Sequence, residues 1–190
     1  MLKFFLVPFL LVMSTISYSQ KTILSIGPEL AFPGSSYSMS TNAGTGFGGS
    51  VRIESTWRKH ISGMLTVGYL GFAEKELPFS GTPPTRTKVK AIPIQAGVKY
   101  YIQKINEPPK GFFISAELGL MPTSTHFDYA VNPDFDFKES GLSTALGIGY
   151  LAGIIEAGFR LQYNLTASGF DVYYYNFRLA YCFLKIKNKK

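Results

Sequence analysis

Two short stretches contain side chains whose types and spacing could perform chemistry. In the first, His60 lies two residues before Ser62, so on one face of a strand the histidine could act as the base that activates a serine nucleophile. Arg58 and Lys59 directly precede this pair, and such a charged cluster is more typical of an ordinary turn. We therefore expect no catalytic residue here.

The second stretch could supply oxygen ligands to a calcium ion. His126 and Asp128 are followed by Asp134 and Asp136, and carboxylates are the ligands that Ca²⁺ prefers. The spacing is not that of an EF-hand loop, and the glycine such a loop requires is absent. A solvated loop is the better interpretation, and we expect neither a metal nor another cofactor.

A third set of residues combines four acidic and four basic side chains on the polar phase of alternating segments. Because their formal charges cancel, they could form a balanced network in a confined interior, where unpaired charges would be costly. The set consists of Glu29, Glu54, Glu117, Glu156, Arg52, Lys99, Arg160 and Arg178. Whether they can meet depends on the elements that carry them.

Those elements are strands, because apolar and polar residues alternate with a period of two. Most of the segments have about 9–13 residues, whereas a globular strand averages about 5–6 and a tilted membrane-crossing strand needs about 9–11. The eight segments are Thr22–Phe32, Phe47–Trp57, Ile61–Phe72, Ile92–Ile102, Phe112–Leu120, Gly141–Tyr150, Ile155–Tyr163 and Tyr173–Phe183. We predict an all-β fold, a closed eight-stranded antiparallel up-and-down transmembrane β-barrel.

The connections between these segments alternate in length. Short links at Arg58–His60 and Leu151–Ile154 separate the long links Pro33–Gly46, Ala73–Ala91 and Met121–Ser140. Short periplasmic turns and long outer loops are the pattern of outer-membrane barrels. With a periplasmic N-terminus, the long links all fall outside the cell.

The two phases of the strands also differ in side-chain size. The polar phase is rich in glycine, serine and alanine, which suits a narrow eight-stranded lumen. Aromatic residues gather near the strand ends, as in the girdles of membrane barrels. The predicted girdle is Trp57, Tyr69, Tyr100, Tyr150, Tyr163, Tyr173, Tyr181 and Phe183, with Phe72 and Phe112 nearby. A soluble barrel with an aromatic core is the alternative.

The N-terminus resembles a secretory signal peptide, because Lys3 precedes the apolar run 4–13 and small residues that end at Ser19. We expect residues 1–19 to be this signal peptide, residues 20–186 the barrel domain and residues 187–190 a basic tail. One cysteine among 190 residues excludes a disulfide framework. Export and the position of the charges argue against nucleic acid: the outer links carry −2, whereas the periplasmic ends carry +8 and could contact anionic lipid.

The mature chain resembles the small eight-stranded outer-membrane β-barrel family of Gram-negative bacteria, the OmpA-like and PorT-like "porin family" barrels. The stretch Ile92–Tyr101 and the closing strand Tyr173–Phe183 carry the resemblance. Residues 184–190 follow Phe183, whereas the family's assembly signal usually ends at such an aromatic. The resemblance implies a multi-pass protein of the outer membrane in the cell envelope.

For function we expect a non-enzymatic barrel with a filled lumen and a structural or loop-mediated interaction role, linked by the resemblance to surface assembly or protein export. The expected partners are outer-membrane lipid, the barrel-assembly machinery during insertion and an unidentified extracellular or periplasmic protein, with the barrel itself a monomer. Two alternatives stay open. One is a narrow channel for small solutes or hydrophobic ligands. The other is a lipid-modifying enzyme, because His60 and Ser62 are similar to the His-x-Ser pair of the lipid A deacylase barrels.

Overall fold

The computed structural model describes residues 21–34, 43–74, 86–103, 110–128, 135–166 and 172–187. Among these residues it contains nine strands and no helix that is long and apolar enough to cross a membrane. The strands are β1 Lys21–Pro33, β2 Ala43–Thr56, β3 Ile61–Glu74, β4 Arg86–Ala91, β5 Ile94–Tyr101, β6 Lys110–Asp128, β7 Phe135–Ala152, β8 Ile155–Leu165 and β9 Val172–Lys187.

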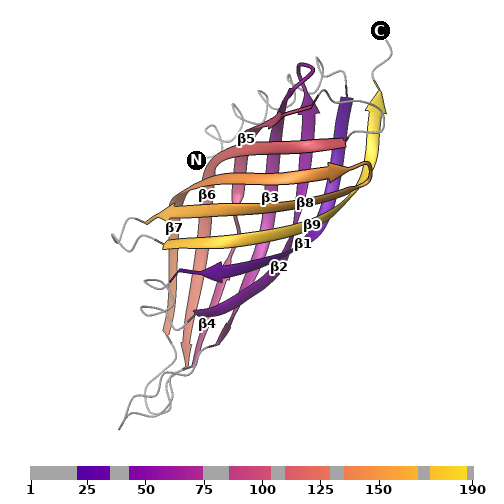
Figure 1. Ribbon diagram of the computed structural model, residues 1–190. Coiled ribbons are helices and arrows are strands. Elements are labelled where there is room, and N and C mark those ends of the chain that lie inside the picture. Colours follow the sequence, from indigo (N-terminus) through magenta and orange to yellow (C-terminus); the bar gives the residue numbers. More distant parts are fainter. Residues whose placement is uncertain are drawn as a thin grey trace.

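The strands form one antiparallel sheet that closes on itself (Figure 1). Each strand pairs with the next along the chain except β4 and β5, which each pair with β3 and β6 instead. β1 also pairs with β9, so the first and last strands complete the wall. Strands in front cross those behind at a large angle in Figure 1, as expected when barrel strands tilt relative to the axis. Closure pairs the two edges that an open sheet would leave exposed.

β4 and β5 together occupy one of the eight strand positions in the wall of this barrel. Both lie between β3 and β6, and the register is the same on either side of the break at Ile92 and Pro93. Pro93 has no N–H to donate to the ladder, but its carbonyl accepts a hydrogen bond from Gly68 N–H at 2.9 Å. The predicted closed eight-stranded barrel is therefore confirmed.

Large apolar side chains cover the outside of the wall. In each strand except β4, the described residues alternate between buried positions facing the lumen and exposed apolar positions facing outward. Leu146, for example, is 67% exposed and Ile148 is 60% exposed. In water such a surface would be a large aggregation-prone patch, whereas in a bilayer it is the lipid-facing surface of a transmembrane barrel.

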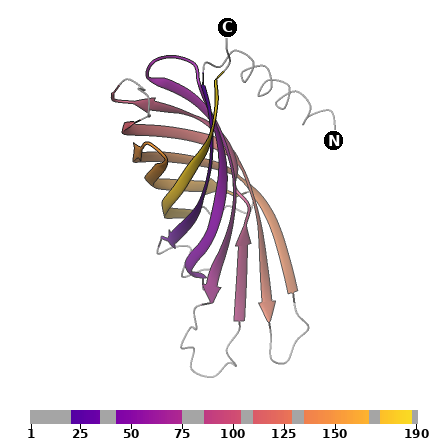
Figure 2. The same ribbon diagram turned by 90° about the vertical axis from the view of Figure 1, so that its right-hand side faces the viewer.

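β6 and β7 are longer than the sequence indicates. They span 19 and 18 residues and remain paired as far as Phe127 and Phe135, so most of the predicted loop Met121–Ser140 is strand, and that prediction is wrong. Figure 2 shows these two strands reaching farther toward the lower end of the barrel than β8 and β9. In β6 the extra residues include the polar run 123–126, which shows no alternation of apolar and polar residues and so conceals the strand from periodicity.

At the other end, short connections turn the chain between β2 and β3 and between β7 and β8. The β7–β8 turn consists of Gly153 and Ile154, and Gly153 has a φ of 69°. Two-residue hairpin turns need such a positive φ, which glycine adopts at no steric cost. We call this end, which also holds Lys21 and Lys187, the turn end, and the opposite end the loop end.

The seam between β1 and β9 is tight at Gly27. The ladder is paired at Ile26–Tyr181 and at Glu29–Arg178, with Gly27 between them. A Cβ atom added to Gly27 would lie 2.0 Å from the Leu179 carbonyl oxygen. A side chain here would force the two backbones apart.

Candidate functional site in the barrel lumen

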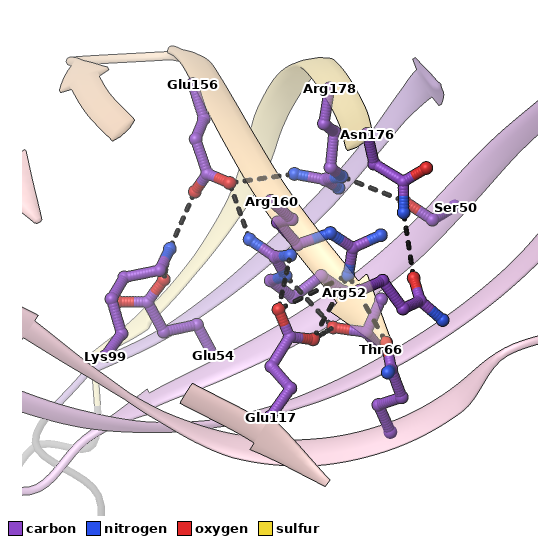
Figure 3. A network of polar contacts seen from close by, with 12 residues as sticks. Ser50, Arg52, Glu54, Thr66, Lys99, Glu117, Glu156, Arg160, Asn176 and Arg178 are labelled. Carbon is purple, nitrogen blue, oxygen red and sulfur yellow. Dashed lines mark hydrogen bonds and ion pairs between the residues drawn. The ribbon is translucent and has the colours of Figure 1, made fainter. Parts of the chain in front are cut away.

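The eight charged residues of the polar phase meet inside the barrel, and all of them except Glu29 are labelled in Figure 3. All eight are at most 4% exposed, and they come from β1, β2, β5, β6, β8 and β9. Because strand side chains alternate between faces, each of these strands points its charge into the same enclosed volume. We call this set the lumen charge network.

Six of the eight residues form a closed ring of alternating charge. The order around the ring is Glu156, Arg52, Glu117, Arg160, Glu29, Arg178 and back to Glu156. For the successive ion pairs in that order, the nearest N–O distances are 2.7, 3.4, 3.3, 2.9, 3.6 and 2.9 Å. Every member has two partners of opposite charge, so the Coulomb attraction offsets the desolvation of each buried group.

The remaining two charges form a branch toward the turn end. Lys99 Nζ lies 2.7 Å from Glu156 and 2.6 Å from Glu54. The Tyr101 hydroxyl donates a hydrogen bond of 2.7 Å to the other oxygen of Glu54. Lys99 also lies 4.3 Å from the centre of the Phe113 ring, a cation–π distance.

A chain of neutral polar side chains continues the network toward the loop end. Ser143 Oγ accepts hydrogen bonds from Gln95 at 3.0 Å and from Gln162 at 2.9 Å. Asn176 Nδ2 in turn donates to Gln162 Oε1 at 2.8 Å. Their amides and hydroxyl are buried and hydrogen-bonded to one another, so this part of the lumen is filled with ordered polar groups.

Two apolar layers enclose the polar centre, one at each end of the lumen. Near the loop end lie Ala31, Leu70, Phe72, Val89, Ala91, Met121, Val172 and Tyr174. Near the turn end lie Ile23, Tyr101, Phe113, Leu151 and Cys182. The sequence prediction missed these layers. Their signal was the presence of large apolar residues, such as Leu70 and Tyr174, in a phase that is otherwise polar.

Phe72 belongs to the loop-end layer rather than to the outer aromatic surface. It is 6% exposed and packs against Tyr174, with ring centres 5.8 Å apart. Its placement among the girdle aromatics is therefore wrong, because Phe72 shares the lumen-facing phase of Gly68 and Leu70.

The predicted girdle residues lie on the outer surface. Trp57, Tyr69, Tyr100, Tyr150, Tyr163, Tyr181 and Phe183 are exposed, and Tyr173 is half-buried. Phe112 is also exposed and packs on Tyr150, with ring centres 4.8 Å apart. Tyr181 and Phe183 stack near the turn end.

The structure separates the His60 and Ser62 side chains by giving each a different partner. His60 Nδ1 lies 2.9 Å from the Tyr101 carbonyl oxygen, and its ring stacks on Tyr100. Ser62 is fully buried, and its hydroxyl lies 3.4 Å from Thr56 Oγ1. The hydrogen-bond partner of the Ser62 hydroxyl is therefore Thr56 rather than His60.

His126 lies on the extended part of β6, where its Nδ1 is 2.6 Å from Asp136 Oδ1 of β7. Among the residues the structure describes, no three histidine, cysteine or carboxylate side chains come together as a metal site. The predicted signal peptide, residues 188–190 of the basic tail and residues 35–42, 75–85 and 129–134 of the outer links lie outside the described residues.

Comparisons with known proteins support the architecture. No protein-family model and no curated protein sequence matches the chain. Among solved structures, the attachment invasion locus protein Ail of Yersinia pestis matches with a TM-score of 0.61 and 11% identity, covering 88% of this chain and 99% of Ail. Ail in complex with the heparin analogue sucrose octasulfate gives a TM-score of 0.58 with 13% identity, over 87% of this chain and 98% of that one.

The N-terminal β-barrel domain of Pseudomonas aeruginosa OprF matches with a TM-score of 0.57 and 11% identity, covering 87% of this chain and 98% of the domain. At such identities the likeness concerns the fold. The chain therefore has the fold of the small, OmpA-like eight-stranded β-barrels of the Gram-negative outer membrane, and the exposed apolar wall is its transmembrane surface.

Proposed function

We propose that this protein is a non-enzymatic outer-membrane barrel whose lumen is closed, and that it acts as a structural element of the membrane or through contacts at its outer end. The observation that carries the proposal is the filling of the lumen. A ring of paired charges occupies its centre and an apolar layer lies at each end. Water and small solutes have no continuous polar path through such an interior.

The extended parts of β6 and β7 support a role on the outer side. Beyond the exposed apolar residues Leu120 and Leu142, the outward positions of these strands become polar, as at Ser124 and Lys138. Lys90 of β4 continues the same row, because it pairs with Ser124. This polar surface is where we place contacts with a partner outside the membrane, including one that takes part in surface assembly or export.

Planar-bilayer conductance tests the closed lumen. We expect the purified, folded protein to give no stepwise conductance above that of the bare bilayer, because the charge network and both apolar layers block ion passage. A porin with an open channel, inserted in the same bilayer, serves as the positive control. Regular single-channel steps from the folded protein would refute the closed barrel and favour the channel alternative.

A further inference from the structure

A diagonal row of outward-facing residues crosses the outer face of the barrel, in which the small residues Gly49, Pro28 and Ala157 stand beside the larger Leu179 and Tyr150. It follows hydrogen-bonded neighbours from strand to strand, pairing Gly49 with Pro28 and Ala157 with both Leu179 and Tyr150. The adjacent row is bulky throughout. Its successive partners are Phe47, Leu30, Phe177, Phe159, Ile148 and Ile114. At Pro28 and Ala157 the first row is lower than its bulky neighbour, and a groove lies along these positions.

The groove is large and apolar. It has a volume of about 860 Å³, which lies within the range of roughly 300–1,000 Å³ typical of small-molecule sites. It runs from Leu30 and Phe47 on β1 and β2, across β9, β8 and β7, to Phe112 on β6. Its walls are mostly aliphatic and aromatic side chains.

Two glycines deepen the groove where it crosses β7 and β8. Gly149 and Gly158 are cross-strand partners, and both also line the groove. A Cβ on Gly149 would lie 2.4 Å from the Phe113 ring. The Phe113 ring therefore occupies the lumen side of Gly149, and on the outer side only backbone lies between this ring and the groove.

The groove ends beside a positive charge at the turn end. Phe112, Tyr150 and Ile102 line this end. Lys110 precedes Phe112 by two residues, so it shares the outward face one position nearer the turns, and it is exposed. An exposed lysine at the edge of an apolar surface attracts the anionic headgroups of a membrane leaflet.

We propose that this groove binds one acyl chain of an anionic phospholipid of the periplasmic leaflet, with the lipid phosphate at Lys110. The inference rests on the proposed membrane position, which makes hydrocarbon the medium in front of the groove. The apolar lining selects the chain, and Lys110 selects the charge of the headgroup. A second copy of the protein lacks this support, because no acidic residue lines the groove to pair with Lys110.

Native mass spectrometry of the folded full chain tests the site, after reconstitution with equal amounts of phosphatidylglycerol and phosphatidylcholine and release from detergent. We expect one retained lipid per barrel, enriched in phosphatidylglycerol. Ala157→Phe should fill the groove and abolish retention. Ala96→Phe enlarges another exposed alanine, on β5 and outside the groove, and should retain the lipid.

Lys110→Gln separates the headgroup contact from the chain contact. It should leave one lipid bound but lower the preference for phosphatidylglycerol about fivefold, equivalent to the roughly 1 kcal/mol that one lysine contributes near an anionic surface. Equal retention by the wild type and Ala157→Phe, or release as a dimer that Ala157→Phe disrupts, would overturn the proposal. If heated and unheated samples of the wild type migrated alike on a gel, that result would instead count against the membrane barrel itself.

Discussion

The ring of alternating charge makes each lumen residue depend on two others. Arg160, for instance, lies 2.9 Å from Glu29 and 3.3 Å from Glu117. Removing Arg160 leaves Glu29 and Glu117 with one partner each and the buried ring with an unbalanced charge, and breaking a buried pair typically costs about 3–5 kcal/mol. Removing both partners costs less, because the remaining charges stay balanced.

A double-mutant cycle on Arg160 and Glu117 tests this dependence. We expect Arg160→Leu and Glu117→Leu each to lower the free energy of unfolding by about 3–5 kcal/mol, and the double variant to lose clearly less than the sum. Urea unfolding in detergent micelles measures all three. Strictly additive losses would show that the two side chains do not stabilise each other, and Lys138→Leu controls for a general effect of charge removal.

At the level of the elements, the seam between β1 and β9 closes the wall and leaves little space. The absence of a side chain at Gly27 allows the backbones of these strands to approach. Elsewhere a glycine is less constrained: a Cβ on Gly71 of β3 would meet its nearest atom at 3.8 Å.

Alanine substitutions at these two glycines should therefore have unequal effects. Gly27→Ala is expected to destabilise the closed barrel by about 1–3 kcal/mol or more, since relieving the overlap requires a backbone shift. Gly71→Ala should be nearly neutral. The fraction of protein that migrates as the compact form in unheated gel samples measures both, and equal folded fractions would contradict the tight seam.

The strands that alternate between large apolar and small polar residues could be predicted from the sequence, and so could their closure into an eight-stranded barrel. The outer parts of β6 and β7 could not, because residues such as Thr123, Ser124 and Thr125 present similar polarity to both faces. The charged residues could be assigned to one phase, but their partners could not. Which of them meet depends on strand tilt and shear, and these properties belong to the closed barrel.

For the whole molecule, the apolar outer surface distinguishes a membrane barrel from a soluble one. Leu146 lies near the middle of the outward apolar positions of β7, between Leu142 and Tyr150, whereas Ser140 lies on the same face beyond them. In water, a charge at either exposed position would be harmless. In a bilayer its cost depends on depth.

We expect Leu146→Arg to destabilise the barrel by about 2–4 kcal/mol in lipid, the cost of a charge near the bilayer midplane, and Ser140→Arg by about 0–1 kcal/mol, as near an interface. Reversible unfolding from phospholipid vesicles measures this difference. A barrel equally tolerant of both substitutions would not be embedded at this depth.

The charge ring also has a consequence for how the protein assembles. Glu29 on β1 and Arg160 on β8 are separated by 131 residues in sequence, yet they form one of the shortest ion pairs in the ring. A sheet still open between β1 and β9 leaves several of these charges without partners, and hydrocarbon penalises such groups heavily. Closing the wall and neutralising its interior therefore become a single cooperative step, so that partly inserted intermediates are disfavoured.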